Sequence, residues 1–439
     1  RNGISMKSPL IACALLAIAT GASAAPPVDL AKFPDTAASD PKANALMVGT
    51  PPPPDKLVRW ADGSHFRFPN TRWSFSHMRE VMPTADVWRG SGKPSHFARA
   101  EQKLDTVAYT DMDGIARTWG EALAKTWTDG VVVVHRGRIV YEKYFGALEP
   151  HFPHIAMSVT KSFVGLLATM LEHEGKLDPS APVTRYVPEL AATAYGDATV
   201  RQVMDMTTGV QYSENYADPK AEIFGYMTAG AFLPAPPGAE LPGSFFDFLK
   251  TLKKEGEHDQ AFAYKTVNTE VLSWIVQRVS GQALPQLLAQ RLWQKLGAEE
   301  DAYLLVDRTG TASGGGGLNA TLRDMARVGE MMRLKGRFNG QQIVPAAVVA
   351  DIAAGADQAK FAKAGYTTLP NWTYHNQWWI SDQGYYMARG IYGQAIYVDP
   401  KSELVIARFG SHPIAANSVQ DPIILPAYRA IAKHLNRGR

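Results

Sequence analysis

Cysteine is nearly absent from this sequence, whose 439 residues contain only Cys13. Without the first 24 residues none would remain, which excludes disulfides, thiol nucleophiles and cysteine-ligated metals from such a form. An excess of charge is also missing, since 45 Lys and Arg stand against 42 Asp and Glu and no basic block stands out. The chain therefore lacks the excess or clustering of positive charge that is typical of nucleic-acid-binding proteins, and we expect no nucleic-acid partner.

Long apolar runs are missing too, except for one at the front, from Pro9 to Ala25. Lys7 precedes this run, and small residues, Ala22 to Ala24, close it, which is the layout of a secretory signal. The run is too short and too rich in Ala to favour a spanning helix, which needs about 20 strongly apolar residues. We predict a signal peptide at 1–24, export to the periplasm or beyond, and no stable membrane anchor; a plain membrane anchor is the less favoured alternative.

The remaining composition, with 46% hydrophobic and 20% charged residues, is that of a folded chain with a sizeable core, and the length predicts two or three structural units. Residues 25–110 are Pro-rich with little periodicity, so we expect a leader wrapped on the surface. A helical pattern spans 114–127. Two β-rich runs, 131–135 and 139–145, flank a Gly-containing turn and predict a hairpin.

The apolar spacing is mostly helical from Ser158 to about Met332, and strand patterns return after Trp372, followed by a helix at 423–435. Strands near both ends with helices between them predict an α/β (α+β) fold, in which an antiparallel sheet domain formed by 111–157 and 372–439 carries a mainly helical domain at 158–371.

Several catalytic signatures are absent. No Gly-x-Ser-x-Gly occurs, and His173-Glu174 lacks the second histidine of a zinc protease. The run Gly314 to Gly317 lacks the Lys-Ser/Thr of a phosphate loop. We expect it to allow a close backbone approach before a helix that begins near Asn319 or Thr321. No metal or organic cofactor is implied.

A Ser-x-x-Lys tetrad occurs twice, at Ser39 and at Ser158, but only Ser158 opens a run with helical apolar spacing. One helical turn would bring the Lys161 amine beside the Ser158 hydroxyl. A neutral lysine could then take the serine proton, and the helix start would present the Ser158 N–H to an oxyanion. The alternative is that Ser158 caps the helix and Lys161 is solvated; the tetrad alone leaves the two equally supported.

Two later segments strengthen the catalytic interpretation. Three motifs occur in an order that resembles serine β-lactamases, penicillin-binding proteins and related esterases. The first is Ser158-Val-Thr-Lys161, the second is Phe262-Ala-Tyr264-Lys-Thr-Val-Asn-Thr-Glu, and the third is Gly390-Ile-Tyr-Gly-Gln394. The similarity runs from about Trp73 to the C-terminus and is closest to 6-aminohexanoate-dimer hydrolases. It implies a β-lactamase-like fold, a proton relay through Tyr264, and an oxyanion hole completed by the Gln394 N–H. The alternative for Tyr264 is a tyrosine packed at a helix entry.

The resemblance also implies substrate contacts. Gly393 and Tyr392 would lie close to the substrate, Tyr216 would lie near the scissile group, and Glu214 would lie near a substrate ammonium. For Glu214 a plain turn role is nearly as well supported. Either Trp378 or Trp379 would line the cleft while the other packs in the core.

Two departures from the family pattern bear on substrate. Thr266 stands where class C β-lactamases carry Asn, and Ile391 stands where their third motif begins with Lys. Both changes argue against β-lactams as the main substrate.

We therefore expect a serine hydrolase that forms an acyl-enzyme on Ser158 with small esters or linear amides. The alternatives are a β-lactamase or a D-amino-acid peptidase acting on peptidoglycan-like substrates, and a non-catalytic binding protein on the same fold. The sequence leaves the oligomeric state open, a homodimer included.

Overall fold

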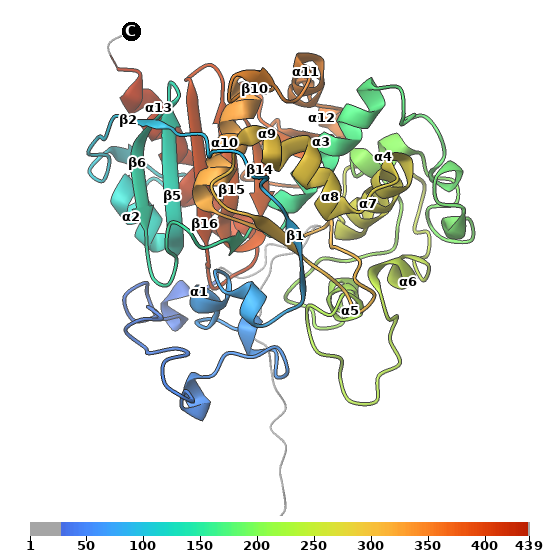
Figure 1. Cartoon of the computed structure of the whole chain (residues 1–439), viewed down its shortest axis with the longest axis horizontal. Helices are drawn as coiled ribbons and strands as arrows, with labels where there is room; N and C mark the ends of the chain where they lie inside the picture. The colour runs from blue at the N-terminus through green and yellow to red at the C-terminus, as the bar shows by residue number, and fades with distance from the viewer. Residues whose placement is uncertain (1–27, 438–439) are drawn as a thin grey trace, which may run out of the picture.

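A computed structural model describes residues 28–437, so the predicted signal peptide lies outside the described residues. An eight-stranded sheet occupies the centre (Figure 1). Its strands, in spatial order, are β12 (Thr373–His375), β13 (Trp378–Ile380), β14 (Tyr386–Gly390), β15 (Gln394–Asp399), β16 (Leu404–Gly410), β5 (Thr128–His135), β6 (Arg138–Tyr144) and β2 (Ala98–Arg99). Neighbours are antiparallel except β2 and β6, which confirms a sheet joined from distant parts of the chain.

The predicted hairpin is confirmed in β5 and β6, where His135 faces Arg138 across a two-residue turn. Both turn residues, Arg136 and Gly137, have positive φ angles of 51° and 77°. Such turns match the twist of the flanking strands, and for this reason they are favoured in two-residue hairpins.

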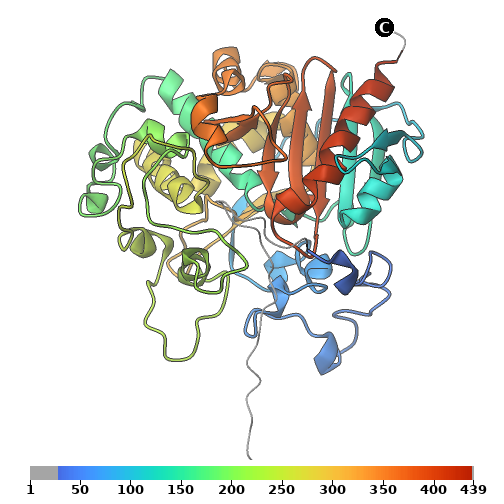
Figure 2. The same ribbon diagram turned by 180° about the vertical axis from the view of Figure 1, so that it is seen from behind.

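The sheet is buried on both faces. Side chains of β5 alternate, so that Val132 and Val134 join one hydrophobic core while Val131 and Val133 join a second. Helix α10 (Leu322–Arg333) covers the first face, and α2 (Trp119–Lys125) with α13 (Asp421–Leu435) covers the second, as Figure 2 shows from behind. The C-terminal helix prediction is thereby confirmed.

The expected helix over 114–127 is shorter in the structure. Thr118 and Glu121 form a capping box that starts α2 at Trp119, and the residues before it form β4 (Ala116–Thr118), which pairs with β3 (Ala108–Thr110). A capping box fixes a helix start more strongly than apolar spacing does, which explains the difference.

The N-terminal segment is more than a surface wrapping. Phe75, Met78 and Val87 are fully buried in the first core. Strand β1 (Thr84–Val87) pairs with β8 (Ala302–Leu305), which continues through β9 (Leu318–Ala320) to β7 (His154–Ile155) in a four-stranded sheet. Part of the segment expected to be a leader therefore belongs to the folded core.

The helical region flanks one edge of the large sheet (Figures 1 and 2). Its helices are α3 (Val159–His173), α4 (Val200–Met204), α5 (Glu222–Ala229), α6 (Phe245–Leu249), α7 (Thr266–Ser280), α8 (Leu284–Leu288), α9 (Gln294–Leu296), α11 (Ala346–Ala354) and α12 (Gln358–Ala362). A short α1 (Thr71–Ser74) lies in the N-terminal segment, and β10 (Arg337–Phe338) pairs with β11 (Gln341–Gln342). Within residues 28–437, no helix has the length and apolarity that a membrane crossing requires.

Helix α3 joins the helical region to the sheet, since it contacts both α7 and β14. It lies so close to the chain before β13 that a Cβ added at Gly165 would sit 2.1 Å from the Asn376 carbonyl oxygen. The glycine therefore sets the depth of α3 in the fold.

We predict that Gly165→Ala destabilises the protein by about 1–3 kcal/mol, since the added methyl meets backbone rather than a movable side chain. Gly92→Ala is the matched control, because a Cβ at Gly92 meets nothing within 4 Å. Urea unfolding of the two variants measures the difference. Equal unfolding midpoints would show that the close packing of α3 is not required.

Candidate active site

Ser158 stands directly before α3, at the boundary between the helical region and the sheet. The preceding Met157 has a φ of 48°, a left-handed conformation that a methionine rarely adopts. The Ser158 side chain makes no capping hydrogen bond to α3, and the residue is 8% exposed. The structure therefore does not support the interpretation of Ser158 as a plain helix cap.

Lys161 lies one turn further along α3 and is 1% exposed, so it is not a solvated side chain. Its Nζ lies 2.9 Å from Ser158 Oγ and also donates to the Gly315 carbonyl oxygen. Burial lowers the pKa of Lys161 to about 8, although the carboxylates of Glu214 and Glu270 act in the opposite direction. The neutral form of the amine is therefore the major one above about pH 8.

Tyr264 completes this cluster. Its ring centroid lies 5.3 Å from the Lys161 Nζ, so the ring lies beside the contact between Ser158 and Lys161. Burial raises the pKa of Tyr264 well above its usual value. The hydroxyl, the amine and the phenol that were predicted from separate segments thus meet in one place. The other tetrad differs, because Lys42 pairs with Glu149 at the surface.

The third motif, Gly390 to Gln394, approaches Ser158 through other residues than those expected. A Cβ added at Gly390 would lie 2.9 Å from the Ser158 backbone nitrogen, and Ile391 lines the same pocket as Ser158. A Cβ at Gly393 would instead meet Arg408, and the Gln394 side chain bonds backbone atoms of Gly410. Neither Gly393 nor Gln394 lines the pocket at Ser158, so the expected roles of both are corrected.

The other predicted substrate contacts divide into two groups. Tyr216 and Tyr392 both line the pocket beside Ser158. Glu214 does not, because its carboxylate accepts a hydrogen bond of 3.0 Å from the Thr266 N–H at the start of α7. Its carboxylate holds the start of α7, and its expected position near a substrate ammonium stays a prediction.

The two neighbouring tryptophans point in opposite directions. Trp379 packs against Tyr264, with ring centroids 5.3 Å apart. Trp378 is fully buried in the first core and donates from Nε1 to the Ser162 carbonyl oxygen. Trp379 is therefore the one on the side of the site, although neither ring lines the pocket itself.

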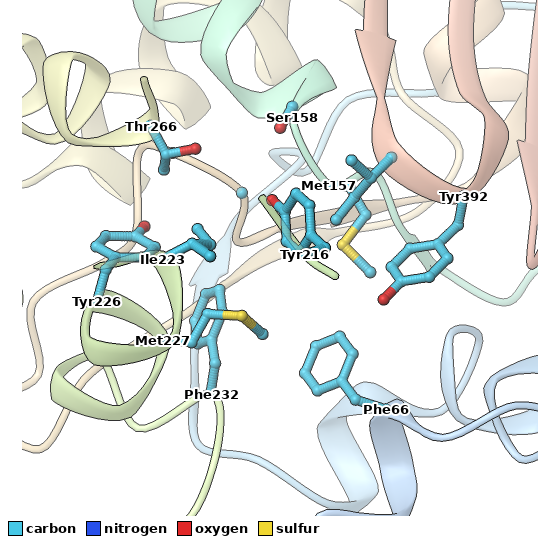
Figure 3. A pocket seen from close by; sticks show the side chains of 13 residues that line it. Phe66, Met157, Ser158, Tyr216, Ile223, Tyr226, Met227, Phe232, Thr266 and Tyr392 are labelled. Atoms are coloured by element: carbon cyan, nitrogen blue, oxygen red, sulfur yellow. The ribbon is translucent and has the colours of Figure 1, made fainter. Parts of the chain in front are cut away.

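A pocket opens beside Ser158 and is walled mainly by apolar side chains (Figure 3). The helical region supplies Ile223, Met227 and Phe232, and the sheet side supplies Tyr392. Phe66 comes from the N-terminal segment. Three distant parts of the chain therefore enclose one space next to the serine.

Glu270, on α7, was missed by the sequence analysis, since nothing marks it among other helical glutamates. It is fully buried and accepts hydrogen bonds from the Gly315 N–H at 2.9 Å, the Gly314 N–H at 3.1 Å, Ser313 Oγ at 2.8 Å and Tyr226 Oη at 2.5 Å. Burial raises the pKa of Glu270, and the four donors act in the opposite direction because they stabilise its ionised carboxylate. Glu270 thereby fixes the glycine turn whose Gly315 carbonyl holds Lys161.

A metal site is not evident in the part of the chain that the structure describes. Among residues 28–437, no group of three or more His, Cys, Asp or Glu side chains could hold a metal ion.

Comparison with known proteins identifies the family of this chain. The Beta-lactamase family model matches residues 115–418. A 6-aminohexanoate-dimer hydrolase from Paenarthrobacter ureafaciens is 34% identical over 370 residues, which cover 83% of this chain and 92% of the relative.

Two solved structures extend the comparison. A Bacillus anthracis protein assigned provisionally as a 6-aminohexanoate-dimer hydrolase has a TM-score of 0.80 and 32% identity over 88% of this chain and 99% of its own. EstCE1, described as a hydrolase with promiscuous acyltransferase activity, shares the fold at a TM-score of 0.54 and 17% identity, over 72% of this chain and 98% of its own. The chain belongs to the beta-lactamase family and is a hydrolase of that family.

We predict that Glu270→Gln lowers kcat for ester hydrolysis by about 10–100-fold, because an amide cannot accept from all four donors and the Gly315 carbonyl shifts. The acidic limb of the pH profile should also move to lower pH, since a carboxylate that raises the pKa of Lys161 is lost. The other charged or titratable groups facing Lys161 are Glu214 and Tyr264, and the substitution changes neither residue.

Glu330→Gln is the matched control, because Glu330 is an equally buried glutamate that pairs with Arg333 within α10. Melting curves of both variants separate stability from activity. A folded Glu270→Gln protein with an unchanged kcat and an unchanged acidic limb would show that Glu270 is only structural.

Proposed function

We propose that this hydrolase cleaves esters or linear amides of small molecules through an acyl-enzyme on Ser158. The observation that carries the proposal is the buried contact of 2.9 Å between Lys161 Nζ and Ser158 Oγ, with the Tyr264 ring centroid 5.3 Å from the same Nζ. The names of the relatives from Paenarthrobacter ureafaciens and Bacillus anthracis support linear amides as one substrate class.

In the first step Ser158 Oγ attacks the carbonyl carbon while its proton passes to the neutral amine of Lys161. The amine needs no long-range movement, because it already lies within hydrogen-bonding distance of the hydroxyl. Collapse of the tetrahedral intermediate breaks the bond to the leaving oxygen or nitrogen and leaves the acyl group on Ser158. Water then attacks the ester, and Ser158 recovers its proton.

Tyr264 is assigned the role of proton donor to the leaving group, and its phenolate then takes back a proton from the Lys161 ammonium, which holds the one that Ser158 lost. Its raised pKa keeps the phenol protonated at neutral pH, so it is better suited to give a proton than to take one from Ser158. Lys161, whose pKa is lowered, is the better base. The opposite shifts of the two groups thus separate the acid from the base.

Backbone N–H groups of Ser158 and Ile391 are assigned to the oxyanion. The close approach of Gly390 to the Ser158 nitrogen supports this pair, because it brings the end of β14 against the start of α3. Such donors stabilise the negative charge that develops on the carbonyl oxygen.

The alternatives are less well supported. Ile391 and Tyr392 present no cation where a β-lactam or peptide carboxylate would bind, which disfavours a β-lactamase or D-amino-acid peptidase. A non-catalytic binding protein would acquire the acyl group once and fail to turn over, so steady release of 4-nitrophenol from short-chain esters excludes it.

Export is also part of the proposal. The apolar run after Lys7 with Ala22-Ser23-Ala24 at its end supports cleavage after residue 24 and a periplasmic or secreted enzyme. Sequencing the N-terminus of the protein recovered outside the cytoplasm tests this assignment.

We predict that a fluorophosphonate probe labels a single peptide, the one that carries Ser158, and that Ser158→Ala abolishes the adduct. Lys161→Ala and Tyr264→Phe should each slow labelling by at least about 100-fold, the usual scale for acid–base groups. Mass spectrometry after digestion identifies the site. An adduct on another residue would remove Ser158 from its role, and normal rates in either variant would show that the proton relay is misassigned.

The pH dependence of acylation follows from Lys161. Because the neutral amine is the reactive form and its pKa is about 8, kcat/KM should rise about tenfold per pH unit below 8 and level off above it. Initial rates with a neutral ester across this range measure the profile. A plateau already present at pH 6, or a rise that continues beyond pH 10, would contradict the assigned base.

A further inference from the structure

The pocket beside Ser158 contains no partner for a charged substrate group. Of the described residues that line it, none carries a charge. Three charged side chains that bond lining residues are already engaged: Lys161 bonds Ser158 and Gly315, Glu214 bonds the Thr266 N–H, and Glu270 bonds Tyr226 and Gly315. An ammonium or carboxylate placed in this pocket would lose its hydration and gain no ion pair in return.

The wall of the pocket is built by contacts between the N-terminal segment and the chain after α5. Trp60 Nε1 donates to the Ala231 carbonyl oxygen at 2.7 Å, and His65 Nε2 lies 2.9 Å from the Phe232 carbonyl oxygen. These bonds bring Phe66 and Phe232 to the same space (Figure 3). The N-terminal segment is thereby a structural part of the substrate pocket.

The size of the pocket limits what it can hold. The cavity volume is about 40 Å³, and one water needs about 10–15 Å³. A short chain of a few non-hydrogen atoms therefore fits. The surrounding Met, Phe and Ile side chains favour carbon atoms over polar ones.

We infer that this pocket binds an uncharged, short apolar substituent next to the scissile bond, so that the enzyme selects neutral esters or amides over substrates ending in an ammonium group. The inference rests on the proposed function of Ser158. It sets this chain apart from a hydrolase whose named substrate is built from 6-aminohexanoate, an amino acid with one amine and one carboxylate.

The test compares 4-nitrophenyl hexanoate with 4-nitrophenyl 6-aminohexanoate at neutral pH, where the two esters differ by one ammonium group. A second pair, butyl and 4-aminobutyl hexanoate, places the ammonium on the leaving group. We expect kcat/KM to favour the neutral member at least about 100-fold in one or both pairs. Less than about threefold discrimination in both pairs would overturn the inference.

Variants of Met227, which faces the pocket in Figure 3, give the matched test. Met227→Glu should raise kcat/KM for the amino ester relative to the neutral ester by at least about tenfold, because it supplies a carboxylate, whereas Met227→Gln should not. Phe66→Ala should reduce kcat/KM more for the hexanoate than for the acetate ester. Equal effects of Glu and Gln would show that charge in the pocket does not determine specificity.

Failure of this inference is distinguishable from failure of the proposed function. Hydrolysis of 4-nitrophenyl acetate and probe labelling at Ser158 report the nucleophile alone. Positive results there with no discrimination between the ester pairs would overturn the pocket assignment and leave the hydrolase mechanism intact.

Discussion

The burial of one lysine amine against one serine hydroxyl is the interaction on which the rest of the site depends. Lys161 is 1% exposed, and this burial disfavours its charged form. Its Nζ lies 2.9 Å from Ser158 Oγ, where a neutral amine can take the serine proton. Such an amine must be held by neutral acceptors and distant carboxylates rather than by a direct ion pair. The Gly315 carbonyl and the buried Glu270 behind it meet this requirement.

The fold supplies this environment from parts of the chain that are far apart. Helix α3 carries the serine and lysine, α7 carries Glu270, and Gly390 brings the sheet against the Ser158 nitrogen. Glycines at Gly165 and Gly390 allow backbones to approach where any side chain would collide. The N-terminal segment adds Phe66, so the substrate pocket requires a third region in addition to the sheet and helices.

Local spacing was enough to predict the helix that places Lys161 beside Ser158, and the order of three motifs added Tyr264 and the fold. The same motifs did not reveal the register of Gly390-Ile-Tyr-Gly-Gln394, because a string with two glycines does not show which one faces the serine. Glu270 was invisible for a different reason. Its partners, Ser313 to Gly315 and Tyr226, come from segments whose meeting depends on tertiary packing.

The most direct measurement of the central claim is the titration of the Lys161 amine itself. Lysine labelled with ¹³C at Cε reports its own protonation by NMR, and comparison with Lys161→Ala identifies the signal. The account predicts a midpoint near 8, as burial requires. A midpoint near 10.4, the value of a solvated lysine, would contradict it.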